Sequence, residues 1–161
     1  MGDVLKIRLK MTKFESPVQE AVLALMVTAS QLRSNMDRVL AEVGLTGEQF
    51  NILRILRGAG ADGHPSGEIS CRMIDRSPDV TRRIDALEAE GLVERERSKQ
   101  DRRVVRVRIT FKGEEVLDTI MPRLHEFEAS ISSQLNTNEL SILAGLCEKI
   151  ISVELDSANE S

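Results

Sequence analysis

The sequence predicts a mainly helical protein with one small β-hairpin, an α+β fold. Three observations support this. Apolar residues recur at helical spacing through most of the chain, a short helix and a turn precede a helix with basic exposed positions, and two strand-like runs follow that helix directly. Only four of the 161 residues are aromatic, all of them phenylalanine, so the core must be built from aliphatic side chains.

Composition and charge limit the class of function. There is no run of about 18 apolar residues, so no membrane span is expected, and two isolated cysteines fit a reducing cytoplasm. The formal net charge is −4, but residues 72–108 hold eleven basic and eight acidic side chains. That segment is net +3 and the rest of the chain −7, which is an asymmetry typical of a confined face that binds a polyanion.

The first 16 residues are expected to form a basic arm ahead of a single domain over residues 17–161. Between residues 5 and 11, apolar side chains alternate with basic ones, which is strand periodicity. Two interpretations stay open for this arm: a frayed, mobile tail, or a segment that pairs with a partner such as a second subunit.

Capping residues mark the first two helices of the domain. A long helix is expected over residues 17–43, opened by its proline and ended by Gly44 as a C-cap. Thr46 begins the next helix, with Gln49 three residues later in a capping-box arrangement. The glycine-rich stretch 58–63 ends this second helix.

A short helix follows, and then a tight turn. Ser66 is expected to cap the short helix, whose apolar side chains include Ile69, Met73 and Ile74. The turn is expected at residues 75–76.

The next helix, over residues 78–90, has the clearest start in the sequence. The run Ser77-Pro78-Asp79 supplies an N-cap, a proline at the first helical position and an acid in the first turn, and Gly91 ends the helix. Arg82 projects opposite the apolar stripe. The residues of that stripe are Val80, Ile84 and Leu87.

A hairpin with a charged tip is predicted from residues 92–97, a polar connector and residues 104–109. In the second run Val105, Val107 and Ile109 share one face. Arg106 and Arg108 lie on the other face, where they are expected to be solvated or ion-paired.

Two long helices are expected to close the chain. Thr110 caps the first, in which Pro122 is a candidate kink, and Asn136 or Thr137 caps the second. Residues 156–161 are expected to be a loose tail. The apolar stripe of the last helix consists of Leu140, Leu143, Ala144, Cys147 and Ile151.

This order of elements predicts a winged helix-turn-helix over residues 46–109 between long helices at 17–43 and 110–156. These long helices carry apolar stripes that one small lobe could not cover, so they are expected to be dimerisation helices. The major groove of DNA admits one α-helix, whose N-terminal side chains reach base edges, and Arg can bind guanine through two hydrogen bonds. Arginines at the tip of the hairpin suit a narrow minor groove. The candidate DNA-binding residues are Ser77, Asp79, Thr81, Arg82, Arg83, Lys99, Arg102 and Arg103.

Several spaced motifs, in this order, resemble the MarR (multiple-antibiotic-resistance regulator) family. They are Leu45-Thr46…Gln49-Phe50, Val80-Thr81-Arg82…Leu87-Glu88…Gly91-Leu92-Val93-Glu94-Arg95, Asp101-Arg102-Arg103 and Ile109-Thr110…Gly113. The resemblance implies a homodimer whose terminal helices interlock and whose two recognition helices read a pseudo-palindrome in double-stranded DNA. It also implies that Arg103 enters the minor groove and that Asp101 orients it. We therefore expect a DNA-binding transcription regulator, by preference a repressor.

One position departs from the family pattern. Where these regulators usually have Ser or Thr just after the cap of the recognition helix, this chain has Pro78 and Asp79. A carboxylate would repel phosphate, so Asp79 either accepts from a cytosine amino group or holds an arginine. Arg95 is expected to orient the hairpin by pairing with Asp101 or Glu94.

Members of the family often bind small aromatic acids or lipophiles between the dimerisation helices and the DNA-binding lobe. A small-molecule effector is therefore an open expectation here. The residues that could line its cleft are Met26, Ser30, Arg33 and Phe127.

Other classes of function are less well supported. His64 and His125 offer too few ligands for zinc, and no cofactor motif or catalytic constellation stands out, so no metal, cofactor or enzyme activity is expected. Cys71 and Cys147 are interpreted as small buried hydrophobes, with a redox-sensing regulator as the alternative. A winged helix that binds only proteins is the other alternative, favoured by the acidic pI of about 5.3.

Overall fold

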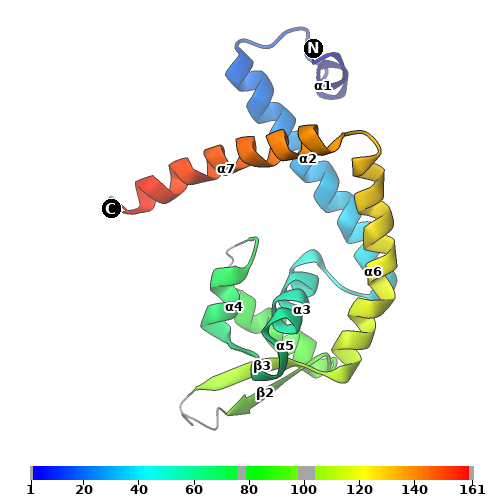
Figure 1. Ribbon diagram of the computed structural model, residues 1–161, viewed down its shortest axis with the longest axis vertical. Helices are drawn as coiled ribbons and strands as arrows, with labels where there is room; N and C mark the ends of the chain where they lie inside the picture. Colours follow the sequence, from blue (N-terminus) through cyan, green and yellow to red (C-terminus); the bar gives the residue numbers. More distant parts are fainter. Residues whose placement is uncertain (1, 76–78, 98–103, 160–161) are drawn as a thin grey trace. The chain divides into compact units, whose positions relative to one another are not determined.

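A computed structural model describes residues 2–75, 79–97 and 104–159, without the side chains of residues 153–159. The chain divides into two compact units, Met1–Ile120 and Met121–Ser161. Figure 1 shows the elements in order. They are α1 (Asp3–Leu9), α2 (Pro17–Leu40), η1 (Ala41–Val43), α3 (Gly47–Ala59), η2 (Gly60–Asp62), β1 (His64–Pro65), α4 (Ser66–Arg72), α5 (Val80–Ala89), β2 (Val93–Arg97), β3 (Val105–Ile109), α6 (Phe111–Ser132) and α7 (Thr137–Asn159).

The N-terminal arm contains a helix, α1, so the strand expected there is wrong. Its charges suit the helix dipole, because Asp3 lies in the first turn and Lys6 and Arg8 lie in the last. Lys6 stands over the ring of Phe14, 5.7 Å from its centroid, and Arg8 donates to Gln31 on α2 at 2.9 Å. A short alternating run is compatible with either structure, and here the helix satisfies its own backbone without a neighbouring strand.

The predicted cap of α3 is confirmed, whereas α2 ends three residues earlier than expected, at Leu40, and Gly44 caps the short helix η1 that follows it. Gly44 follows η1 in the left-handed conformation, with φ of 73°, which a residue without Cβ adopts at no steric cost. Thr46 Oγ1 accepts from the Gln49 backbone at 3.2 Å, and Gln49 Oε1 accepts from the Thr46 backbone at 3.0 Å. This reciprocal pair satisfies two backbone donors that the start of α3 would otherwise leave without partners.

The short helix α4 differs from its prediction at both ends. Ser66 is its first residue rather than its cap; Pro65 holds the cap position, and no side chain caps the helix there. The helix stops at Arg72, so Met73 and Ile74 lie beyond it. Met73 is buried, whereas Ile74 is 78% exposed.

The core of the first unit is aliphatic, as the composition required. Its fully buried side chains come from α2, α3, α4, α5, the sheet and α6. They are Leu40, Ile52, Leu53, Leu56, Ile69, Ile84, Leu87, Val93, Val107, Leu117 and Ile120. Burial of so many large aliphatic side chains is the main stabilising contribution to this unit.

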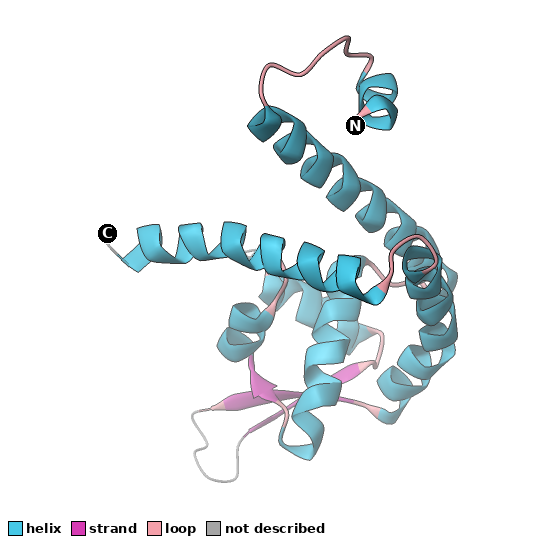
Figure 2. Cartoon of the chain, turned by 45° about the horizontal axis from the view of Figure 1, so that its top comes forward, coloured by secondary structure: helices cyan, strands magenta, loops and turns pink. Residues whose placement is uncertain are grey.

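The sheet has three antiparallel strands in the order β1-β3-β2 (magenta in Figure 2). The hairpin is confirmed, with Val93 opposite Ile109 and Arg97 opposite Val105. Strand β1 was not predicted, because two residues are too few to show a period. Gly63 permits this pairing: a Cβ there would lie 2.2 Å from the carbonyl oxygen of Val107.

Arg57 joins α3 to the start of α6. Its guanidinium lies 2.5 Å from Glu114 and 2.5 Å from Asp118. The hydrogen bond to Glu114 is the main reason that the pKa of Arg57 is raised above its usual value. These contacts join residues 57 and 61 positions apart, so no local sequence pattern predicted them.

The last two helices follow the predicted caps. Thr110 Oγ1 accepts from the Gly113 backbone at 3.1 Å, and α6 continues through Pro122. Asn136 Oδ1 accepts from the Glu139 backbone at 3.0 Å, so Asn136 caps α7. The expected loose tail is wrong in part, because α7 extends to Asn159. Within the described residues, no helix is long and apolar enough to cross a membrane.

Candidate nucleic-acid interface

The recognition helix, α5, presents one face to the core and one to solvent. Val80, Ile84 and Leu87 are at most 3% exposed, which confirms the predicted stripe. Thr81 and Arg82 are exposed on the first turn, as expected. Within the described part of the chain, Arg82 has no polar partner. Its guanidinium is therefore available to an external acceptor.

The start of α5 differs from the prediction. The helix begins at Val80, so Asp79, expected in the first turn, occupies the N-cap position. Asp79 is exposed, and its side chain makes no capping hydrogen bond. Ser77, the expected cap, lies outside the described residues together with Pro78.

Arg83 points back toward the protein. Its Nε lies 2.5 Å from Glu48 Oε2 on α3, and its side chain is 21% exposed. Both Arg82 and Arg83 were expected at the DNA surface. The structure places Arg83 in an ion pair that fixes α5 to α3, so Arg82 is the more exposed of the two.

Arg95 joins the wing, the hairpin of β2 and β3, to the recognition helix. Its guanidinium lies 2.5 Å from Asp85 and also contacts Glu88, while its backbone N–H donates to Glu88 at 3.2 Å. Burial lowers the pKa of Arg95, but the hydrogen bonds to Asp85 and Glu88 outweigh burial and raise it overall. The expected pairing with Glu94 is wrong, because adjacent residues of a strand point to opposite faces.

The other strand arginines are bound within the sheet. Arg108 pairs with Glu96 across the hairpin at 2.5 Å, in agreement with the ion pairing expected for it. Arg106 instead donates to the backbone oxygens of Asp62 and Gly63 at 2.7 Å and 3.0 Å. These contacts anchor the loop before β1 to β3. The wing-tip candidates Lys99, Asp101, Arg102 and Arg103 lie outside the described residues.

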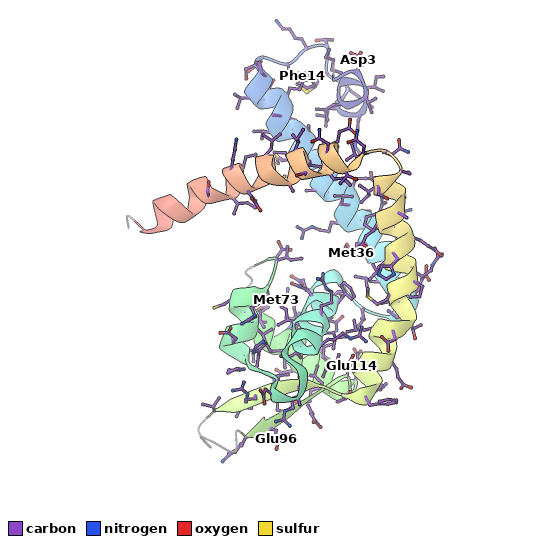
Figure 3. The ribbon with its side chains drawn as sticks, in the orientation of Figure 1. Asp3, Phe14, Met36, Met73, Glu96 and Glu114 are labelled. Atoms are coloured by element: carbon purple, nitrogen blue, oxygen red, sulfur yellow. The ribbon has the colours of Figure 1, made fainter. Side chains whose placement is uncertain are left out.

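A pocket of about 700 Å³ opens between α2, the start of α3 and the segment after α4. Figure 3 labels two of its lining residues, Met36 on α2 and Met73 after α4. The lining residues are Ala29, Leu32, Arg33, Met36, Asp37, Leu45, Thr46, Gly47, Glu48, Asn51, Met73, Ile74 and Asp75.

Of the four residues expected to line a ligand cleft, the pocket contains Arg33. Met26 and Ser30 lie on α2 but are not part of its lining, and Phe127 belongs to the second unit. Arg33 donates to Asp75 at 2.7 Å, and the Ile74 backbone donates to Asn51 at 3.0 Å. Both contacts hold the segment that leads toward α5.

Comparison with known proteins identifies the family. Residues 45–105 match the sequence profile of the MarR family. The chain is 30% identical over 138 residues to the transcriptional repressor MprA of Escherichia coli K12, covering 84% of this chain and 78% of that protein. This chain belongs to the MarR family. The family is one of transcription regulators, as the motifs had implied.

Solved MarR-family structures agree with the observed fold. A MarR transcription factor from Planctomyces limnophilus is 32% identical, with a TM-score of 0.64 and coverage of 84% of this chain and 98% of that one. The repressor CouR, solved bound to a 23-mer DNA duplex, is 27% identical, with a TM-score of 0.71 and coverage of 80% and 90%. The mostly helical fold with a small antiparallel wing is therefore that of the MarR winged helix.

The cysteines of this MarR-family chain do not share one environment. Cys71 is exposed on α4, so the buried role expected for it is wrong, because it lies on the side of α4 away from buried Ile69. Cys147 on α7 is half-buried. Among the residues that the structure describes, no three His, Cys, Asp or Glu side chains cluster as metal ligands would.

Sequence reasoning missed two features of the MarR lobe. The first is the acidic pocket, whose residues Asp37, Glu48 and Asp75 come from three segments of the chain. A partial signal was available, because Ala29, Arg33 and Asp37 share helical spacing on α2. The true partners of Arg83 and Arg95 were also missed. An acidic residue near an arginine in sequence is too common to identify a pair.

Proposed function

We propose that this chain is a transcription repressor that binds a pseudo-palindromic operator in double-stranded DNA as a homodimer. The observation that carries the proposal is the exposed first turn of α5, where Arg82 stands opposite a buried stripe and Thr81 lies on its flank. A helix held this way can enter the major groove with its N-terminal side chains toward the bases. The relatives named as repressors, MprA and CouR, support the direction of regulation.

The roles of the individual residues follow from their positions. Arg82 suits two hydrogen bonds to a guanine, with Thr81 beside it for a base or phosphate contact. The wing-tip residues Lys99, Arg102 and Arg103 supply phosphate and minor-groove contacts, and Asp101 orients Arg103. Asp79 either accepts from a cytosine amino group or holds an arginine. These contacts would be made in the cytoplasm, where a regulator meets chromosomal DNA.

The homodimer is proposed to form through the terminal helices. On α7, five large apolar side chains are 43–58% exposed in the single chain, and Val18, Val22 and Met26 on α2 are 48–71% exposed. Exposed apolar side chains along one helix mark interfaces between proteins. The five on α7 are Ile142, Leu143, Leu146, Ile150 and Ile151.

Fluorescence anisotropy tests the DNA-binding proposal. Labelled duplexes from the DNA that flanks the gene are titrated at several salt concentrations, with scrambled duplexes as references. Arg82→Ala should weaken cognate binding by about 1–3 kcal/mol and flatten discrimination at one base pair in each half-site. Lys149→Ala, which removes one basic charge from α7, is the matched control and should leave both quantities unchanged.

Wing variants separate the remaining roles. Lys99→Ala should weaken all duplexes about equally and reduce the salt dependence, because a phosphate contact carries no sequence information. Arg103→Ala should act most strongly where the flanking minor groove is narrow. Absence of any duplex preference in the wild type, with no effect of Arg82→Ala or Arg103→Ala, would support the protein-interaction module instead.

We further propose that the pocket beside α2 binds a small-molecule effector that changes operator affinity. Its volume of about 700 Å³ lies in the usual range for a ligand site, and most of its lining is apolar with a few charged groups. Of the four residues expected to line the cleft, Arg33 lies in this lining. Met26, Ser30 and Phe127 are not proposed to contact the effector in this pocket.

A further inference from the structure

The charges around the pocket are strongly unbalanced. Its lining contains the carboxylates of Asp37, Glu48 and Asp75 but only one basic side chain, Arg33, so the lining carries a net charge of −2. The apolar part of the lining comes from Ala29, Leu32, Met36, Leu45, Met73 and Ile74. An occupant that matches both properties combines apolar groups with a positive charge.

All three carboxylates lie near enough to Arg33 to raise its pKa. The hydrogen bond and the charge of Asp75 raise the pKa of Arg33, and the charges of Asp37 and Glu48 raise it further. The carboxylate of Asp37 also lies beside the first turn of α3, since a Cβ on Gly47 would be 3.2 Å from its Oδ1. Within the described part of the chain, the carboxylate of Asp37 makes no ion pair or hydrogen bond.

An anion is a poor match for this lining. Arg33, the only cation it contains, already donates to Asp75 at 2.7 Å. An incoming carboxylate would have to share Arg33 with Asp75 and would then face Asp37 and Glu48. Like charges in such a site repel, and an opposite charge is attracted. The lining therefore favours an occupant with a positive charge, whereas the aromatic acids that the family resemblance suggests are negatively charged.

Glu48 belongs to the pocket and to the recognition helix at once. Its carboxylate lines the pocket and lies 2.5 Å from Arg83 on α5, with 35% of the side chain exposed. A cation that approaches Glu48 must share this carboxylate with Arg83. The pocket and α5 are thus connected through one named ion pair.

We propose that this pocket binds a lipophilic cation, and that the bound cation competes with Arg83 for Glu48 and so weakens operator binding. The second part rests on the proposed function, while the first depends on the pocket alone. Competition for Glu48 loosens the attachment of α5 to α3, which misplaces the helix for the major groove. A ligand changes an equilibrium only through such a difference in contacts between two states.

Calorimetric titration of the full chain tests the first part without DNA. Tetraphenylphosphonium and tetraphenylborate have nearly the same size and shape but opposite charge. Asp37→Asn should weaken tetraphenylphosphonium binding by about two- to fivefold, as expected for one exposed charge. Glu115→Gln removes an exposed carboxylate from α6 outside the pocket and should leave the affinity unchanged. Basic surface elsewhere can attract the borate, so the borate is judged only by its response to Asp37→Asn.

Tetraphenylphosphonium affinity that is unaffected by Asp37→Asn would overturn the cation site, as would borate affinity that falls in that variant. An absence of phosphonium binding would overturn it as well, while normal operator binding by the same preparation would leave the proposed function standing. Phosphonium binding that depends on Asp37, in a protein that binds no operator, would support the cation site and overturn the proposed function.

Anisotropy titrations with and without phosphonium test the competition. Saturating cation should lower operator affinity, and operator should lower cation affinity by the same factor, since linkage is reciprocal. Glu48→Gln should weaken operator binding by itself and reduce the further effect of the cation, because both act on one ion pair. Operator affinity that is unchanged by bound cation would overturn the coupling, and so would a full cation effect in Glu48→Gln.

Discussion

The guanidinium of Arg95 on β2 lies 2.5 Å from the carboxylate of Asp85 on α5. With the second contact to Glu88, this ion pair makes the wing and the recognition helix one connected unit. In the proposed complex, the distance between a base contact in the major groove and a wing contact in the minor groove therefore depends on Arg95. Its side chain is 24% exposed, so the pair is shielded more than most surface pairs.

Arg95→Ala is expected to destabilise the fold by about 1–3 kcal/mol, because it leaves Asp85 and Glu88 without their shared partner. Arg95→Lys should recover part of this loss. Urea unfolding measures the free energy, with Arg97→Ala on the exposed end of the same strand as control. Equal effects of Arg95→Ala and Arg97→Ala would contradict the role given to Arg95.

Arg83 and Glu48 should behave as a coupled pair. In a double-mutant cycle of Arg83→Ala and Glu48→Gln, the interaction energy in unfolding should be about 0.5–1 kcal/mol, since both side chains are partly exposed. Urea unfolding of the four proteins supplies the cycle. Strict additivity would mean that the ion pair does not attach α5 to α3. Loss of operator affinity in Arg83→Ala with no loss of stability would instead favour a direct DNA contact.

Gly113→Ala should destabilise the protein strongly although Gly113 lies in a helix. A Cβ there would stand 2.3 Å from the backbone oxygen of Leu92, which cannot move aside as a flexible side chain could. A backbone shift with overpacking costs about 1–3 kcal/mol. Gly58→Ala on α3 is the control, because a Cβ at Gly58 meets no atom within 4 Å, and it should stabilise by up to about 1 kcal/mol. Urea midpoints that move in the same direction for both variants would contradict this prediction.

Cys71→Ser should change the free energy of unfolding by less than about 0.5 kcal/mol, because the thiol is exposed on α4. Cys147→Ser should cost more, since Cys147 is half-buried. Thermal unfolding compares the two. Exposure also permits oxidation of Cys71, so operator binding should be measured after mild peroxide. Loss of binding that thiol restores and Cys71→Ser prevents would support the redox-sensing alternative.

Sedimentation equilibrium at micromolar concentration should give twice the chain mass of 17.9 kDa. The physical reason is the exposed apolar surface of α7 and α2, which a stable homodimer would cover. Leu146→Glu on α7 should weaken the dimer, and Glu148→Gln on the same helix is the control. A monomer at this concentration would contradict both the dimer and the pseudo-palindromic operator.

The sequence alone determined the features that depend on near neighbours. The capping box of Thr46 and Gln49, the left-handed Gly44 and the buried stripe of α5 all arise from residues a few positions apart. Helical caps and helical periodicity are local, so their patterns are readable before folding. The recognition helix and the exposed place of Arg82 on it were predicted for this reason.

Tertiary structure alone decided which charged groups meet. The pairs Arg83 with Glu48 and Arg33 with Asp75 join residues 35 and 42 positions apart, and the sequence offers many equivalent partners for each arginine. The strand β1 likewise exists only because β3 lies beside it, and the exposure of Cys71 depends on which side of α4 the core covers. Packing of distant segments selects these contacts, since electrostatic attraction has no sequence period of its own. The pocket and its connection to α5 through Glu48 are therefore properties of the fold.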